Sequence, residues 1–273
     1  MSAPLKAVIL AAGAGNRIST VSKDTPKPLL TLDGTGNAAS PTFLDWHLWS
    51  LAKAGAKEIY IVGNKRTYQT KLLAERDVTV TWILNPTDDL STSGSGHSTQ
   101  YAWHSDHDIL DGKSRVILMD ADILYDPSIY DLLTAAHSPR SKTLVCSDYR
   151  ETNEEVMVFA KKESPKVPTM HGKGLLGTAL TEGSVCLGEA TGILLWEPGD
   201  HEALRSVTDW VIRYSTAKAR SEHEDLTQRM MQLGKVECVS FGRDVPFMEC
   251  DTPEEYAVLA SEMYPRLRGT LGL

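Results

Sequence analysis

The stretch from Leu5 to Leu32 most constrains the fold that this chain can adopt, because an apolar run leads directly into a glycine turn. The run from Ala7 to Ala12 predicts a buried strand. The turn behind it contains Gly13, Ala14 and Gly15. Glycine lets backbone N–H groups approach a ligand that a Cβ would hold away. A buried strand that ends in such a turn indicates a loop that binds phosphate.

Two basic residues follow the turn. Arg17 lies directly behind it, and Lys27 comes ten residues later between two prolines. The fixed φ angles of proline stiffen this segment and aim the lysine. The pattern is not a P-loop, and Ile18 stands where a G-x-G-x-x-G motif would have its last glycine. Strand, turn, guanidinium and ammonium together still favour phosphate binding.

These motifs resemble the signature of the nucleotidyltransferase superfamily. That signature reads L-A-A-G-x-G-x-R followed by P-K-x-L, and it appears here at residues 10–17 and 26–29. The resemblance implies a Rossmann-like fold, a three-layer α/β/α sandwich around a mostly parallel central sheet. It also implies an enzyme that joins a nucleoside triphosphate to a sugar phosphate or a small phospho-alcohol.

The rest of the chain alternates between helical and extended patterns, as repeated βα units do. We expect the order of these elements to build one domain over residues 1–273. Residues 1–125 would bind the nucleotide and residues 126–273 the acceptor. The expected helices are 41–55, 65–75, 97–107, 127–137, 199–214, 222–233 and one that begins at Pro253; the expected strands are 58–62, 78–84, 115–119, 142–147, 156–161, 185–188, 190–196, 236–241 and 246–249.

Two aspartates, Asp122 and Asp251, each follow a short apolar strand. We expect both at the carboxyl edge of one sheet, where α/β proteins bind their ligands. The resemblance implies that they hold a catalytic Mg²⁺, and a few oxygen ligands suit that ion. Asp122 is favoured over Asp120, and whether Asp120 shares the metal stays open. The alternative for Asp251 is that it merely favours the N-terminus of the helix behind it.

The site residues follow from these motifs and from the resemblance. Lys27 and Arg17 are the expected catalytic residues, with Lys27 at the α-phosphate and acceptor and Arg17 at the β- and γ-phosphates. The expected nucleotide-binding residues are Leu10, Ala11, Ala12, Gly13, Ala14, Gly15, Asn85, Ser93, Ser95, Gly96 and Asp120. The expected acceptor-binding residues are Glu189, Glu224 and Asp225, although helix capping explains the last two equally well.

Within the superfamily, the chain looks most like the small cytidylyltransferases that act on phosphocholine or 2-aminoethylphosphonate. We therefore expect CTP and a small anionic phospho- or phosphono-acceptor as its partners. One or two of five widely spread tryptophans would suit a quaternary ammonium group: Trp46, Trp82, Trp103, Trp196 and Trp210. The alternatives are a sugar-1-phosphate nucleotidylyltransferase that uses UTP or dTTP, and a nucleotide sensor without turnover.

Composition narrows the partners further. The formal net charge of −8 argues against a nucleic-acid surface, whereas residues 1–30 carry four basic side chains against one acidic side chain. A positive pocket on an acidic body suits a small polyanion. The sequence contains no run of 18 apolar residues and no signal-peptide pattern, so we expect a cytoplasmic protein without a membrane partner. A homodimer stays open.

Overall fold

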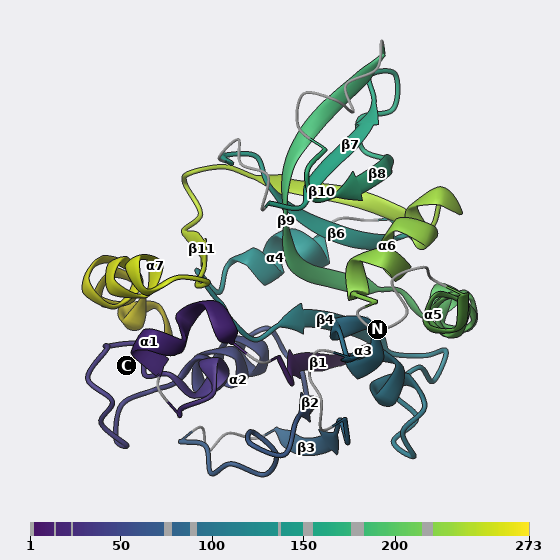
Figure 1. Ribbon diagram of the computed structural model, residues 1–273. Coiled ribbons are helices and arrows are strands. Elements are labelled where there is room, and N and C mark those ends of the chain that lie inside the picture. Colours follow the sequence, from purple (N-terminus) through teal and green to yellow (C-terminus); the bar gives the residue numbers. More distant parts are fainter. Residues whose placement is uncertain are drawn as a thin grey trace.

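The structure is a computed structural model that describes residues 3–13, 15–22, 24–73, 78–87, 92–135, 138–149, 155–175, 183–214 and 221–272. A twisted central sheet runs through the molecule (Figure 1). Its main path follows the order β10-β6-β9-β4-β1-β2-β3, and β7 and β8 extend it from β9. The strands on the main path are β1 (Leu5–Ala11), β2 (Glu58–Gly63), β3 (Thr79–Leu84), β4 (Arg115–Asp120), β6 (Ser141–Cys146), β9 (Ser184–Trp196) and β10 (Val236–Phe241).

The part of the sheet that carries the glycine turn is parallel. β1 lies between β2 and β4, parallel to both, and β3 continues the parallel order beyond β2. β9 runs antiparallel to its neighbours β4 and β6. The expected fold, a mostly parallel sheet between helical layers, is confirmed.

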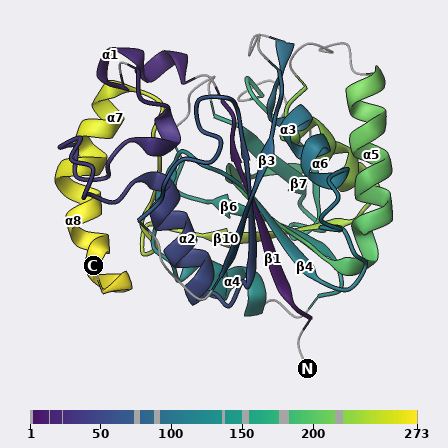
Figure 2. The ribbon, with the colours of Figure 1, turned by 90° about the horizontal axis from the view of Figure 1, so that it is seen from below.

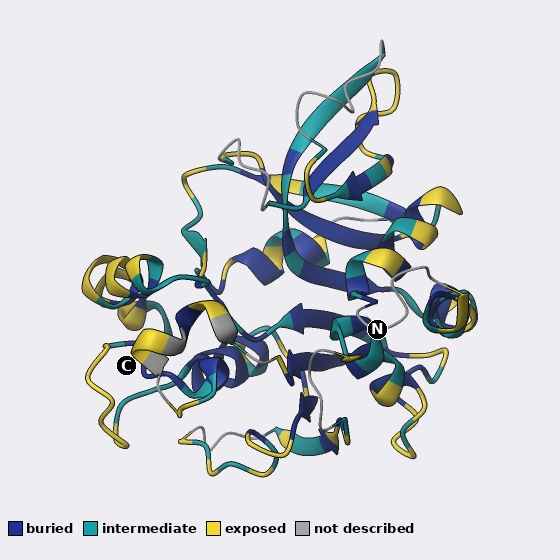
Figure 3. Cartoon of the chain, viewed as in Figure 1, coloured by how far each residue is buried: buried dark blue, intermediate teal, exposed yellow. Residues whose placement is uncertain are grey.

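Helices cover both faces of the sheet (Figure 2). β1 explains why, because its alternate residues enter different cores: Ala7 and Ile9 pack on one face, and Val8 and Leu10 on the other. The strands are accordingly buried, whereas exposed residues gather on outer helices and loops (Figure 3). The first face packs against α2 (Phe43–Lys53), α4 (Ile129–Ala135), α7 (Pro253–Val258) and α8 (Tyr264–Leu267); the second packs against α3 (Ser95–Trp103), α5 (His201–Tyr214) and α6 (His223–Gln232).

A β-arm rises from the sheet above α6 (Figure 1). It contains β7 (Met157–Lys161), β8 (Pro168–Gly172) and the first half of β9. The sequence predicted two separate strands over 185–188 and 190–196, and this prediction was wrong, because β9 is one strand. β9 stays continuous because Gly188 and Gly192 adopt positive φ values of 133° and 70° that let one strand bend.

The predicted helix over 65–75 is also wrong in its described part, where residues 65–69 form turns. The side chain of Asn64 accepts hydrogen bonds from the Arg66 and Thr67 amides, which closes a turn in place of a helix. Gln69 then takes a φ of 57°, which no helix continues. Residues 74–77 lie outside the described residues.

Of two short strands that pair with each other, the sequence predicted only one. β5 (Ile123–Tyr125) was missed, and it pairs antiparallel with β11 (Phe247–Glu249) in a separate two-stranded sheet. The helix after β11 begins as predicted, because Thr252 accepts a hydrogen bond from the Glu255 amide and the Glu255 carboxylate accepts one from the Thr252 amide. In the described part of the chain, no helix is long and apolar enough to cross a membrane.

Candidate active site

The glycine turn after β1 is anchored from β2. Asn64, which follows β2, donates a hydrogen bond of 2.9 Å from Nδ2 to the carbonyl of Ala12. Gly15 adopts a φ of 65°, and a Cβ there would lie 3.3 Å from the Cβ of Lys27. Glycine at position 15 therefore lets the turn pack against the lysine segment. Sequence reasoning missed Asn64, whose place at the carboxyl end of a parallel strand was the available signal.

The other residues predicted for nucleotide binding differ in how far they are buried. Leu10, Ala11 and Ala12 are buried, so this part of the chain is held firmly by the core. Gly13 is exposed, and an added Cβ would find nothing within 4 Å. Ala14 lies outside the described residues.

Lys27 joins the two predicted metal ligands. Its side chain is almost fully buried, and Nζ lies 2.7 Å from Asp122 Oδ2 and 2.7 Å from Asp251 Oδ1. Burial disfavours the ammonium charge, but the two carboxylates outweigh it and raise the pKa of Lys27 above its ordinary value. Lys27 is therefore a fixed positive charge at this position.

Arg17 contacts the same group of acids. One of its Nη atoms lies 2.7 Å from Asp251 Oδ2, and about half of the Arg17 side chain is exposed. Burial opposes charge on Asp251, but Lys27 and then Arg17 lower the pKa of this carboxyl below its ordinary value. The structure thus brings together all four residues predicted for catalysis and metal binding.

Asp251 reaches this place by a route that the sequence did not predict. It does not follow a strand of the central sheet, because β11 pairs with β5 instead. The Cys250 amide donates a hydrogen bond of 2.9 Å to the Asp122 carbonyl, which sets the two aspartates side by side. Glu255 accepts a hydrogen bond from the Asp251 amide, so the cap of α7 fixes the backbone here.

Glu249 adds a third carboxylate. Oxygen atoms of Asp122, Glu249 and Asp251 lie within 4.8 Å of one another. Desolvation, followed by repulsion from Asp122 and Asp251, raises the pKa of Glu249 well above its ordinary value. Three oxygen donors that repel one another fit a hard divalent cation. Sequence reasoning missed Glu249 as a ligand, although its spacing of two from Asp251 was a signal.

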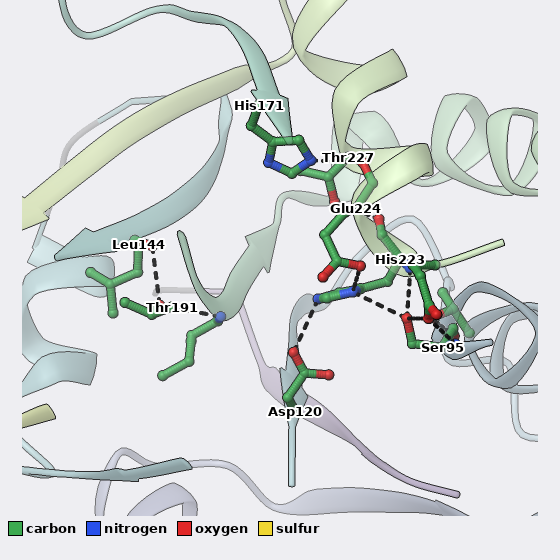
Figure 4. Close-up of polar contacts among 11 residues, drawn as sticks. Ser95, Asp120, Leu144, His171, Thr191, His223, Glu224 and Thr227 are labelled. Atoms are coloured by element: carbon green, nitrogen blue, oxygen red, sulfur yellow. Dashed lines mark hydrogen bonds and ion pairs between the residues drawn. The ribbon is translucent and has the colours of Figure 1, made fainter. Parts of the chain in front are cut away.

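A second polar cluster lies around His223, the first residue of α6 (Figure 4). Its Nδ1 is 2.6 Å from Glu224 Oε2, and its Nε2 is 3.4 Å from Asp120 Oδ2. Burial disfavours a charged ring, but the negative charges of Asp120 and Glu224 outweigh this effect and raise the pKa of His223 to about 10. We therefore describe His223 as an imidazolium held between two acids. Sequence reasoning missed this residue.

The two acids respond in opposite directions. Burial raises the pKa of Asp120 to about 7, against the pull of His223. His223 lowers the pKa of Glu224 to about 2, against burial. Gly192 makes room for Asp120, because a Cβ at that position would overlap the Asp120 carboxylate.

The loop over residues 85–96, which contains the predicted nucleotide-binding residues Asn85, Ser93, Ser95 and Gly96, packs partly against α6. Ser95 donates from its amide and its hydroxyl to Glu222 Oε2, at 2.7 and 2.8 Å. A Cβ on Gly94 or Gly96 would collide with the Ser221 carbonyl, so glycine permits this close approach. The polar atoms of Ser95 are therefore already engaged by protein.

The start of the same loop forms a separate contact. Asn85 is buried and donates from Nδ2 to the hydroxyl groups of Ser93 and Ser98, at 3.0 and 3.1 Å. Asn85 and Ser93 thus meet as a pair, while residues 88–91 lie outside the described residues.

One pocket adjoins both the first polar cluster, formed by Lys27, Asp122, Glu249 and Asp251, and the second cluster around His223. We call it the acceptor pocket, because it contains residues that the sequence predicted for acceptor binding. Its lining includes Glu249 and Asp251 from the first cluster and His223 and Glu224 from the second. Glu189 of β9 also lines it, so two of the three predicted acceptor residues are there.

The third predicted acceptor residue, Asp225, is not among the lining residues of this pocket. Its carboxylate accepts a hydrogen bond of 3.0 Å from the Glu222 amide at the start of α6. Asp225 therefore caps a helix, which was the alternative explanation from the sequence.

Solved structures of nucleotidyltransferases share the fold. The inositol-1-phosphate CTP transferase from T. maritima superposes with a TM-score of 0.73 and 18% identity, over 99% of this chain and 97% of that one. UDP-glucose pyrophosphorylase, complexed with UDP-glucose, gives a TM-score of 0.72 and 12% identity over 96% and 99% of the two chains. At these identities the likeness shows the fold alone.

Two curated relatives match shorter regions. CMP-5'-(3-aminopropyl)phosphonate synthase from Streptomyces rubellomurinus is 29% identical over 136 residues, which are 49% of this chain and 19% of that protein. N-acetylmuramate alpha-1-phosphate uridylyltransferase from Neisseria meningitidis serogroup B is 44% identical over 57 residues, 21% of this chain and 22% of that protein. The chain thus spans about a fifth of the length of the curated relatives that it matches.

A family model matches a longer region of the chain than either curated relative does. Residues 7–184 match the MobA-like NTP transferase domain, a region that includes the glycine turn, Lys27, Asp122 and the start of β9. Because this match covers more than half of the chain, the protein belongs to the MobA-like NTP transferase family.

Proposed function

We propose that the protein is a cytidylyltransferase, which transfers CMP from CTP to a small phosphate- or phosphonate-bearing acceptor and releases pyrophosphate. The observation that carries this proposal is the position of Lys27, held between Asp122 and Asp251 beside the acceptor pocket. Residues 1–125 would bind the nucleotide and residues 126–273 the acceptor. The proposed function involves neither a nucleic acid nor a membrane, and a homodimer could perform it.

In the proposed reaction, an acceptor oxygen attacks the α-phosphorus of CTP. A bond forms between that oxygen and the α-phosphorus, and the bond from the α-phosphorus to the bridging oxygen of pyrophosphate breaks. A phosphate or phosphonate acceptor has a second pKa of about 6 and is largely a dianion at pH 7, so no general base is required. The protein must instead align two anions and reduce their repulsion.

The residues divide this task. Lys27 contacts the acceptor and the α-phosphate, and Arg17 contacts the β- and γ-phosphates. The backbone at Ala11, Ala12 and Gly13 lies against the nucleotide. Asp122 and Asp251, together with Glu249, would hold Mg²⁺, which supplies positive charge that neutralises the phosphates.

Two likenesses support cytidylyl transfer. The inositol-1-phosphate CTP transferase shares the fold over nearly the whole chain, and the aminopropylphosphonate relative forms a CMP-phosphonate by its name. A sugar-1-phosphate nucleotidylyltransferase is the second candidate, because the uridylyltransferase relative is 44% identical over its short match. A nucleotide sensor without turnover is the third candidate.

A pyrophosphate-release assay separates these candidates. Each of four nucleoside triphosphates is paired with phosphocholine, 2-aminoethylphosphonate, hydroxyalkyl phosphonates and several sugar 1-phosphates, in the presence of Mg²⁺. We expect turnover with CTP and a phosphonate or phosphate acceptor. Turnover confined to UTP or dTTP with a sugar 1-phosphate would favour the second candidate, and CTP binding without pyrophosphate release would favour the sensor.

A further inference from the structure

One helix, α6, contacts both regions that the proposed function assigns to substrates. The loop over residues 85–96, which we call the nucleotide loop, meets the N-terminal end of α6, and β8 of the β-arm lies beside the same helix (Figure 1). The acceptor pocket adjoins both, and its lining includes His223, Glu224 and Thr227 of α6, His171 of β8 and Lys173 directly after β8. A helix in this place can position both substrates.

Glu222 holds the nucleotide loop at the N-terminal end of α6. Its Oε2 accepts hydrogen bonds from the amide and the hydroxyl of Ser95, at 2.7 and 2.8 Å. The backbone closes the same contact, because the Gly96 amide donates to the Ser221 carbonyl at 2.9 Å. Ser95 begins α3, and the first amides of a helix have no partner within it. Glu222 therefore satisfies a donor of α3 from the cap position of α6.

Gln228, further along α6, holds the edge of β8. Its Oε1 accepts a hydrogen bond of 2.6 Å from the His171 amide, and its Nε2 donates one of 3.1 Å to the Thr169 carbonyl. Residues two apart in a strand present their amide and carbonyl groups to the same edge, so the side-chain amide pairs with β8 as a strand would. Among the described strands, β8 pairs only with β7. Gln228 thus occupies an edge that a further strand would otherwise cover.

This contact fixes two walls of the acceptor pocket relative to each other. A second hydrogen bond supports it, because His171 Nε2 lies 2.8 Å from the Glu224 carbonyl (Figure 4). Both walls carry charge, with Lys173 after β8 on one side and Glu224 of α6 on the other. A shift of β8 along α6 would therefore change where these charges lie around a bound acceptor.

We propose that α6 positions the two substrates through separate side chains. Glu222 positions the nucleotide by holding the nucleotide loop, and Gln228 positions the acceptor by holding β8. This proposal rests on the proposed function, which places the nucleotide at the loop and the acceptor in the pocket. Both are positioning residues, because they act through Ser95 and through β8.

Three alanine variants of α6 test this division. Glu222→Ala removes the contact with Ser95, and Gln228→Ala removes both hydrogen bonds to β8. Gln232→Ala, one turn beyond Gln228, is the matched control, because its exposed side chain accepts a hydrogen bond from Arg229 of the same helix. For each variant, KM is measured for CTP and for 2-aminoethylphosphonate by pyrophosphate release with Mg²⁺, or for phosphocholine if that acceptor gives the higher rate.

We expect the two variants to affect different substrates. Glu222→Ala should raise KM for CTP about fivefold or more and change KM for the acceptor less than about twofold, on the scale of the hydrogen bonds lost. Gln228→Ala should show the reverse pattern, and Gln232→Ala should change neither value. Glu222→Gln keeps one acceptor oxygen for Ser95 and should recover part of the affinity for CTP.

The pattern of KM values separates positioning from a general loss of structure. A variant that merely loosens α6 would raise both KM values together. Such a joint rise in Glu222→Ala or Gln228→Ala would overturn the proposal, and so would KM values that stay unchanged in both variants.

Calorimetric binding of CTP keeps this proposal distinguishable from the proposed function. If no acceptor supports pyrophosphate release, the proposed function fails. A loss of CTP affinity in Glu222→Ala that is absent from Gln228→Ala would still support separate positioning by α6. Equal losses in the two variants would overturn it, and a wild-type protein that binds no CTP would overturn both proposals.

Discussion

The ammonium of Lys27 and the carboxylate of Asp122 lie 2.7 Å apart, although 95 residues separate them in the chain. The sequence pattern predicted a lysine for phosphate and an aspartate for metal, each considered by itself. The structure pairs them, and Asp251 completes the group. Lys27 therefore lies in direct contact with the two aspartates that are expected to hold the metal ion. A positively charged side chain and metal-binding carboxylates at one position suit the binding of a polyanion.

Replacing Lys27 by alanine should lower the rate of transfer more than nucleotide binding. Arg17 and the glycine turn remain to bind the β- and γ-phosphates, whereas the charge at the reacting phosphate is lost. We expect kcat to fall roughly a hundredfold or more, as when one preorganised charge-stabilising donor is removed. Steady-state kinetics with CTP, combined with calorimetric CTP binding, measures both quantities.

Lys27→Arg is the informative companion variant. A planar guanidinium does not fit where a compact ammonium sits 2.7 Å from two carboxylates, so we expect no rescue of kcat. If Lys27→Ala lost CTP affinity and turnover in the same proportion, Lys27 would contribute only to the binding of CTP and not specifically to the transfer step.

Activity should require a divalent cation held by the three clustered carboxylates. We expect Asp122→Asn and Asp251→Asn nearly to abolish turnover, and Glu249→Gln to raise the Mg²⁺ concentration needed for half-maximal rate, while circular dichroism stays that of the folded protein. Asp106→Asn, at an exposed aspartate, is the control. Full activity in excess EDTA would end the metal hypothesis.

The charge on His223 should make stability depend on pH in the alkaline range. Its pKa is raised from 6.5 to about 10 by Asp120 and Glu224 against burial. A raised pKa stabilises the fold fully below the unfolded value, and this contribution is lost as pH rises from about 6.5 through 10. Urea unfolding should show the advantage of wild type over His223→Gln shrinking by a few kcal/mol, to order of magnitude, across this range.

A surface histidine provides the control for that experiment. His104 pairs with Asp209 at 2.7 Å, but both side chains are substantially exposed. We expect His104→Gln to change stability little at any pH, because exposed ion pairs contribute little. A difference between wild type and His223→Gln that stays constant from pH 6.5 to 10 would contradict a charged His223.

The sequence predicted best what is local. The turn after β1, the lysine between prolines and the cap at Thr252 are read from neighbouring residues, and the structure contains each of them. The helix expected over 65–75 failed for a local reason too, because the side chain of Asn64 closes a turn that apolar periodicity does not reveal.

Pairings between distant segments were beyond this reasoning. The contact of Cys250 with Asp122 depends on the pairing of β5 with β11. β11 lies within the strand expected over 246–249, but β5 has only three residues and is too short to carry a periodic pattern. His223 gains its surroundings from a neighbour on another element, Asp120. A single histidine in a sequence carries no such information.

CTP should be preferred over UTP by at least roughly tenfold, the scale of one discriminating hydrogen bond. Cytosine presents an amino donor where uracil presents an acceptor, so the site needs a buried acceptor, which we place within residues 85–95. The ratio of kcat/KM for the two nucleotides measures this preference. Equal use of CTP and UTP, or a preference for UTP, would favour the alternative function of a sugar-1-phosphate nucleotidylyltransferase.

Asn85 should support that preference indirectly, because it holds the loop. Its Nδ2 donates to Ser93 and Ser98, and its Oδ1 accepts from the Thr87 amide. Asn85→Leu keeps a similar volume but loses these contacts, so we expect the CTP to UTP ratio to fall several-fold while kcat with CTP changes less. Ser105→Ala, which removes a hydroxyl just beyond α3 that donates to the Ala102 carbonyl, is the control. A ratio unchanged in Asn85→Leu would place base recognition outside this loop.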